Sequence, residues 1–234
     1  MGGKLFVIEG GDGSGKATQT LLLKARLEKQ GFKVNIVDFP VHHTAFYGRM
    51  VDRYLRGEFG EPSEVNPYLI AILYANDRRA LKEYMQRCLE QGNIILANRY
   101  TQSNKAFQGA KFKTMEEQDA FFEWNDELEY KEHGIPKPDL VIYLSVPREV
   151  GNDWVLKKEK RDYLGTIKMD KHETNLDLQK KAEAVYERLA DKEKLLKKIV
   201  CFEKGQMLSR EAIAEKVWRM VKPYLKPVKQ KKLF

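Results

Sequence analysis

Short apolar segments alternate with longer segments of mixed polarity along the whole chain. Two of the apolar segments, 93–97 (NIILA) and 140–144 (LVIYL), consist almost entirely of apolar residues. Strands of this kind are buried on both faces, as in a parallel sheet covered by helices. We predict five strands, at Leu5–Glu9, Lys33–Asp38, Asn93–Ala97, Leu140–Leu144 and Ile199–Phe202.

Helix-terminating residues lie between these strands. Gly31 is placed to close a helix over 15–30, and Asn66-Pro67 is placed to begin one that runs to Gln91. A third helix is predicted from Glu116 to Glu132, before Gly134 and two prolines. Repeated strand–helix units predict a doubly wound α/β fold.

The chain shows no internal repeat, linker or break in composition, so we predict one domain over residues 1–234. The charged stretch Lys157–Glu173 has little apolar periodicity and is predicted to be a mobile surface insertion. Residues 222–234 carry five lysines and no acid, which is typical of a solvated basic tail.

Composition narrows the possible partners. Of the 234 residues, 42% are hydrophobic and 32% charged, and the formal net charge is +8, which favours anionic partners such as nucleotides, nucleic acid or anionic lipid. No stretch approaches the roughly 20 apolar residues of a membrane span, and no signal peptide is evident, so we expect a cytoplasmic protein without a membrane partner. Two cysteines in apolar surroundings, Cys88 and Cys201, favour a reducing compartment.

A phosphate-binding loop follows the first strand. The spacing Gly10-x4-Gly15-Lys16 lets consecutive backbone N–H groups face a phosphate at a helix N-terminus, with Lys16 reaching the β and γ phosphates of a nucleotide. The predicted ATP contacts are Gly11, Gly13, Ser14, Gly15, Lys16, Ala17 and Thr18.

One position of this loop departs from the usual pattern. The residue after the lysine normally has a hydroxyl group that binds Mg²⁺, and here it is Ala17. Thr18 is about 100° further round the helix. Mg²⁺ is therefore expected to depend on phosphate oxygens, water and a carboxylate.

Four segments resemble the thymidylate kinases, which phosphorylate dTMP with ATP. They are 9–19 (EGGDGSGKATQ), 38–40 (DFP), 74–78 (YANDR) and 98–108 (NRYTQSNKAFQ), and the resemblance extends from about Lys4 to about Val221. It implies a P-loop kinase fold with a five-stranded parallel sheet and a short mobile lid at about 157–173. It also implies ATP and dTMP as substrates, Mg²⁺ as cofactor, and a homodimer.

The resemblance also implies roles for single residues. Tyr74 would stack on thymine, Arg78 would hydrogen-bond the base, and Phe107 would crowd the 2′ position of the sugar. The implied acceptor site comprises Asp12, Phe39, Pro40, Tyr74, Arg78, Arg99, Ser103, Asn104, Phe107 and Gln108. The implied catalytic residues are Lys16, Arg99, Asp12 and, in the lid, Arg161.

Two departures from the family pattern leave alternatives open. Asn98 stands where the family has an aspartate, so it is a metal ligand without charge, and Val41-His42-His43 stands where the family commonly has an arginine after Phe-Pro. A nucleoside monophosphate kinase with another acceptor is the nearest alternative. A nucleotide-binding protein without turnover is the second, and a nucleic-acid binder that uses the basic tail is the third.

Overall fold

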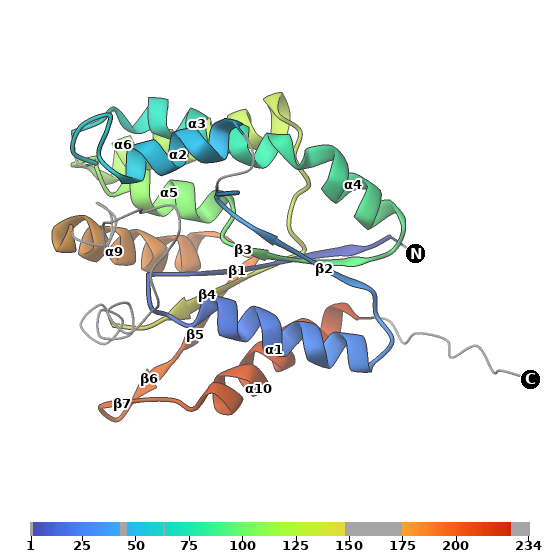
Figure 1. Ribbon diagram of the computed structural model, residues 1–234. Coiled ribbons are helices and arrows are strands. Elements are labelled where there is room, and N and C mark those ends of the chain that lie inside the picture. Colours follow the sequence, from blue (N-terminus) through green and yellow to red (C-terminus); the bar gives the residue numbers. More distant parts are fainter. Residues whose placement is uncertain (1, 43–45, 63, 148–174, 226–234) are drawn as a thin grey trace, which may run out of the picture.

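The fold is built on a five-stranded parallel sheet. In the computed structural model, which describes residues 2–42, 46–62, 64–147 and 175–225, the strands follow the order β2-β3-β1-β4-β5 (Figure 1). Their bounds are β1 Lys4–Gly10, β2 Val34–Asp38, β3 Ile94–Asn98, β4 Leu140–Ser145 and β5 Leu196–Val200. The predicted five-stranded parallel sheet is confirmed.

Helices cover both faces of this sheet (Figure 1). On one face lie α1 (Lys16–Lys29) and α10 (Arg210–Val221). The other face carries α3 (Pro67–Ala80), α4 (Lys82–Glu90), α5 (Thr101–Gly109), α6 (Met115–Asp126) and α9 (Leu176–Lys192), while α2 (Phe46–Leu55) packs on α3. Two short helices, η1 (Glu127–Glu132) and η3 (Lys222–Tyr224), complete the helices of the described ranges.

Alternating side chains of β1 explain why the core has two layers. Leu5 and Val7 pack among the residues of α5 and α9, whereas Phe6 and Ile8 pack among those of α1 and α10. All four side chains are fully buried. A central strand with apolar residues at successive positions is thereby buried on both faces, as its composition predicted.

The residues predicted to begin and end helices lie at the observed helix ends. The Asn66 side chain accepts hydrogen bonds from the backbone N–H groups of Tyr68 and Leu69, with Pro67 in the first turn of α3. Gly31 adopts φ 87° just after α1, a conformation that glycine takes without strain.

Three predicted elements are corrected by the structure. Strand β5 runs from Leu196 to Val200 rather than from Ile199 to Phe202, because its inward positions are Leu196 and Ile199 and its exposed residues hide the pattern, while Phe202 belongs to the short strand β6. The predicted helix 66–91 is two helices, since the Leu81 N–H bonds the Arg78 carbonyl and the chain turns there. The helix that begins at Met115 changes to a π-helix at Glu127.

Helices α2, α5, α9 and α10 were not predicted, and neither was a small hairpin. Strands β6 (Phe202–Glu203) and β7 (Gln206–Met207) form an antiparallel hairpin, with Lys204 and Gly205 both at positive φ in the turn. Within the described ranges no helix is long and apolar enough to cross a membrane. The predicted insertion at 157–173, with Arg161, and the tail from 226 onward lie outside the described residues.

Candidate active site

The carboxyl ends of the parallel strands gather polar residues at one edge of the sheet. Strand β1 ends at Gly10, β2 at Asp38 and β3 at Asn98. The helices that follow β1 and β3, α1 and α5, lie on opposite faces of the sheet (Figure 1). A crevice forms at such a reversal, and open α/β sheets bind their ligands there.

The loop between β1 and α1 has the shape of a phosphate cradle. Gly10 has φ 151°, and a Cβ atom there would lie 2.6 Å from the Ser14 Oγ, so only glycine fits. The Lys16 ammonium lies over the loop and donates to the carbonyls of Gly10 (3.1 Å) and Gly11 (2.8 Å). A bound phosphate would replace these carbonyls as its partner.

The first turn of α1 adds backbone N–H groups to this cradle. Gly15, at φ 87°, precedes the helix, and no acidic side chain lies in the first turn. The Ser14 Oγ is buried and has no hydrogen-bond partner in the described chain. Its hydroxyl group is therefore available to donate to an oxygen atom of a bound phosphate. Ala17 contributes only its backbone N–H, and Thr18 follows it in the same turn.

Arg99 and Asp12 form an ion pair between β3 and the phosphate loop. The Arg99 Nη2 lies 2.6 Å from the Asp12 Oδ1, and its Nη1 donates to the Ser103 Oγ at 3.1 Å. The second Asp12 oxygen accepts from Gln179 of α9 at 3.0 Å. Burial lowers the pKa of Arg99, but Asp12 together with Tyr186, Glu9 and Tyr74 raises it by more, so the guanidinium stays charged.

The backbone of Arg99 is held in an uncommon conformation. Its φ is 63°, in the left-handed region, while its N–H donates to the Ile8 carbonyl at 3.0 Å. Residues with branched or long side chains rarely adopt this region unless the surroundings fix them. The hydrogen bond to β1 and the ion pair to Asp12 supply that support.

Sequence analysis missed Glu9, a fully buried carboxylate directly before the phosphate loop. One oxygen accepts from the backbone N–H groups of Tyr100 (2.7 Å) and Ser103 (3.1 Å). The other accepts from the Ser103 Oγ (2.7 Å) and the Tyr186 hydroxyl (2.9 Å). Glu9 thereby fixes the start of α5 against β1. Its signal in the sequence was an acid inside an otherwise apolar strand.

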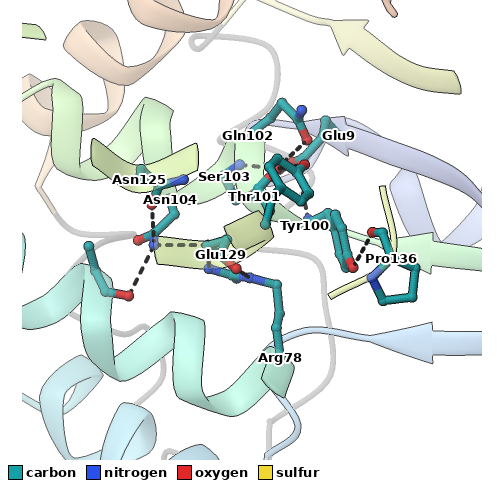
Figure 2. A network of polar contacts seen from close by, with 12 residues as sticks. Glu9, Arg78, Tyr100, Thr101, Gln102, Ser103, Asn104, Asn125, Glu129 and Pro136 are labelled. Carbon is teal, nitrogen blue, oxygen red and sulfur yellow. Dashed lines mark hydrogen bonds and ion pairs between the residues drawn. The ribbon is translucent and has the colours of Figure 1, made fainter. Parts of the chain in front are cut away.

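A second buried ion pair lies beside Asn104 of α5. Figure 2 shows Arg78 of α3 and Glu129 of the π-helix facing each other, with donor–acceptor distances of 2.7 Å from Nε and 2.5 Å from Nη2. The side chains are only 2% and 0% exposed. Burial lowers the pKa of Arg78, but Glu129 together with Asp77 and Tyr100 raises it by more, so the guanidinium stays charged. Sequence analysis expected Arg78 and missed Glu129.

Unsatisfied amide groups lie beside this pair. The Asn104 Nδ2 donates to the Ala71 carbonyl (3.1 Å), to Asn125 (2.9 Å) and to Glu129 (3.4 Å), as Figure 2 shows for the labelled residues. Its Oδ1, both polar atoms of Gln108 and the Asn125 Nδ2 are buried and have no hydrogen-bond partner among the described residues. Each such group costs about 1–3 kcal/mol unless a ligand satisfies it.

Three aromatic residues of the predicted acceptor site differ in exposure. Phe39 is 2% exposed and packs on Tyr100 with ring centroids 5.8 Å apart, so it supports the site from the core. Phe107 is 7% exposed and lies under the Arg99 guanidinium, 5.3 Å from its carbon. Tyr74 is partly exposed, with its ring edge-on to Tyr54 at 6.4 Å.

The turn after β2 is anchored to α3. Asp77 is fully buried and accepts from the Val41 N–H at 2.9 Å, and burial raises the pKa of Asp77. His42 pairs with the buried Asp52 of α2. The Phe39-Pro40 peptide bond is cis. These contacts fix Pro40 at the edge of the crevice without an arginine in this turn.

The structure therefore brings most of the predicted residues to one end of the sheet. Asp12 contacts Arg99 directly, Arg99 contacts Ser103 and Phe107, and Glu129 links Asn104 to Arg78. Ser103 hydrogen-bonds both Glu9 and Arg99, so it helps to hold Arg99 in position. Two subsites result, a phosphate cradle on β1 and α1 and an amide-lined wall on α5.

A parallel sheet whose first strand leads through a phosphate loop into a helix, with an arginine opposite that loop, defines a P-loop kinase fold. A family model described as thymidylate kinase matches residues 8–211. The chain belongs to the thymidylate kinase family.

Similar proteins from distant organisms are also thymidylate kinases. A thymidylate kinase of Schizosaccharomyces pombe is 35% identical over 62% of this chain and 61% of its own length. One of Mycobacterium tuberculosis is 29% identical over 80% and 85%, and a probable thymidylate kinase of Pyrococcus abyssi is 29% identical over 95% and 97%. The solved thymidylate kinase of Candida albicans superposes with a TM-score of 0.72 at 21% identity, over 95% and 92% of the two chains, which supports the fold.

Proposed function

We propose that the protein transfers the γ-phosphate of ATP to dTMP, giving ADP and dTDP. The observation that carries this proposal is that α5 joins two subsites. Its Ser103 contacts Arg99 beside the phosphate cradle, and the unsatisfied amides of Asn104 and Gln108 belong to the same helix. A pyrimidine base offers both donors and acceptors to such amides, and a phosphate suits Lys16 and Arg99.

In the proposed reaction, the cradle positions ATP, and the side chains of Lys16 and Arg99 neutralise the charge of the phosphoryl group as it is transferred. Phosphoryl transfer passes through a loose transition state with charge spread over the oxygens, so positioning and electrostatic stabilisation provide most of the acceleration. Arg99 is suited to this task because Asp12 and Ser103 hold its guanidinium in place. The acceptor phosphate oxygen attacks directly, without a covalent enzyme intermediate. Arg161 is proposed as a further cation from the lid.

On the acceptor side, the proposed roles follow from exposure and bonding. Tyr74 offers a partly exposed ring for stacking on the base, and Phe107, which lies under Arg99, is proposed to face the sugar. Arg78 already makes two bonds to Glu129, which leaves the remaining guanidinium N–H groups for the base.

Mg²⁺ bound to ATP is part of the same proposal, and the donor set fits a weakly held ion. The Asn98 Oδ1 is buried without a hydrogen-bond partner in the described part of the chain, which suits an oxygen ligand. No group of three or more His, Cys, Asp or Glu side chains that could hold a metal occurs among the described residues. Mg²⁺ would neutralise charge between the β and γ phosphates, with most of its ligands from ATP and water.

We further propose a homodimer in the cytoplasm. The family resemblance implies the dimer, and the two buried free cysteines fit a reducing compartment. A membrane partner is not proposed, and neither is a nucleic-acid partner.

The test is ADP release from ATP and Mg²⁺ with dTMP as acceptor, beside dUMP, dCMP, dGMP and UMP. A preference for dTMP supports the proposal. A preference for another monophosphate would instead make the chain a kinase of that acceptor, the alternative raised by Val41 and His42 after Phe39-Pro40. A chain that binds ATP and turns over no acceptor would be a nucleotide-binding protein. Filter binding of RNA and DNA at low and high salt would identify a nucleic-acid binder, since phosphate-driven binding weakens steeply with salt.

A further inference from the structure

On the first two strands and the phosphate loop three acids lie near the cradle, and two of them are already engaged. Among the described residues Glu183 of α9 also lies there, in a cavity lined by Gly11 and Asp12. Both oxygens of Glu9 accept hydrogen bonds, two each, from α5 and α9. Both oxygens of Asp12 are engaged, one by Arg99 and the other by Gln179. The third acid is Asp38, the last residue of β2.

Strand register places Asp38 beside Asn98. The two residues are partners in the parallel pairing of β2 with β3, so their side chains leave the sheet on the same face. The Asn98 side chain lies close enough to the Asp38 carboxylate to lower its pKa, and the buried Asn98 Oδ1 has no hydrogen-bond partner in the residues described. A charged oxygen and a neutral oxygen thus stand together at the sheet edge.

The surroundings of Asp38 are those of the phosphate site. Burial raises the pKa of its carboxyl group, while Arg99, Lys16 and His42 lower it through their charges. The residue nevertheless keeps contact with solvent. The other charged groups packed near this turn are Asp52, which pairs with His42, and Asp77, which holds Val41. A cation that arrives with a nucleotide can therefore reach Asp38 from the solvent side.

Mg²⁺ in nucleotide sites is held by one or two carboxylates besides the phosphates. Ala17 has no hydroxyl group, and Asn98 has no charge. We propose that Asp38 supplies the carboxylate that holds the nucleotide-bound Mg²⁺, with the Asn98 Oδ1 beside it. The carboxylate is thereby provided by β2 instead of β3. This inference rests on the proposed use of Mg²⁺ and ATP.

The test measures metal binding directly and needs neither acceptor nor turnover. Mn²⁺ replaces Mg²⁺, and the free Mn²⁺ signal in electron paramagnetic resonance is followed as metal is added to the protein with the non-hydrolysable ATP analogue AMPPNP. In Asp38→Asn we expect Mn²⁺ affinity of this complex to fall about tenfold, as expected for a lost ligand or its close support. AMPPNP affinity in EDTA should not fall, because the metal-free phosphates lose only a repulsive neighbour.

The decisive variant moves the carboxylate back to β3. In Asp38→Asn/Asn98→Asp the charge is restored one strand away, and Mn²⁺ affinity should recover to within about threefold of the original protein. Asp191→Asn, at the exposed end of α9, removes the same charge far from the sheet edge and should leave Mn²⁺ affinity unchanged. Thermal unfolding of each variant confirms that it folds.

Unchanged Mn²⁺ affinity in Asp38→Asn would overturn the proposal and leave Asp38 as a counter-charge for Lys16 and Arg99. A loss that the double variant fails to recover would also overturn it. A chain that phosphorylated some other monophosphate would fail the dTMP assay and still show the Mn²⁺ response, so the two proposals fail separately.

Discussion

Glu129 holds Arg78 through two hydrogen bonds in a site that water does not reach. The same carboxylate accepts a longer bond from Asn104, so one acid orients two residues of the proposed base site (Figure 2). It projects from a π-helix, and such turns often occur at functional sites. The orientation of both residues thus depends on a group that does not itself belong to the predicted site.

Glu129→Gln should be strongly destabilising. It leaves the Arg78 guanidinium buried without a counter-charge, for which we expect a loss of about 3–5 kcal/mol in the free energy of unfolding. Urea unfolding measures this. Glu127→Gln breaks the exposed pair with Lys131 (3.1 Å) in the same helix and should cost less than about 0.5 kcal/mol. Equal losses in the two variants would mean that burial of the pair contributes nothing.

Tyr74→Leu should weaken binding of the acceptor dTMP and leave binding of ATP almost unchanged. Stacking of a base on an aromatic ring contributes about 1–3 kcal/mol, so the KM for dTMP should rise at least about fivefold. The KM for ATP should stay within about twofold. Steady-state kinetics with each substrate varied in turn gives both values, and Tyr84→Leu on α4 is the control. A parallel rise in both constants would place Tyr74 outside the acceptor site.

Tyr186→Phe removes one of the four donors to the buried Glu9 carboxylate. Hydrogen bonds to charged groups contribute about 1.5–3 kcal/mol, so the free energy of unfolding should fall by that amount. Tyr84→Phe loses an exposed hydrogen bond from Asn35 (3.0 Å), and its free energy of unfolding should fall by less than about 1 kcal/mol. Chemical denaturation of the two variants tests this, and a Tyr186→Phe protein as stable as the original would show that the other three donors suffice.

Lys111 should make stability rise with pH in the alkaline range. Burial lowers the pKa of its ammonium to about 8, whereas the unfolded chain keeps the ordinary value. Above pH 8 the unfolded chain therefore binds more protons, so the folded state gains about 1 kcal/mol between pH 7 and pH 9. Lys111→Met should remove that increment, which a comparison of unfolding free energies at the two pH values would detect. An identical pH slope in both proteins would contradict the shifted pKa.

The sequence predicted what depends on neighbours in the chain. The phosphate loop, the Asn66 cap and the Gly31 terminator are each complete within a few residues, so their patterns are visible in one dimension. The five strands were found for the same reason, although both bounds of β5 were misplaced. There two lysines face solvent between Leu196 and Ile199, and they mask the strand.

The partners of the site residues could not be predicted in this way. Glu129 lies 51 positions from Arg78, and Gln179 lies 167 positions from Asp12. An acid in a helix usually faces solvent, and only the packed structure shows that Glu129 does not. Arg78 was found because a family motif marks it, whereas its counter-charge has no motif.

The Glu9 carboxylate also bears on how the chain folds. Its donors come from residues 91, 94 and 177 positions away, on α5 and α9. A partly folded chain that had formed β1 but had not docked α9 would bury this charge with an incomplete set of donors, which is costly. Such long-range closure slows folding. It also discourages stable intermediates, so the phosphate loop should become ordered only when the C-terminal part of the chain is in place.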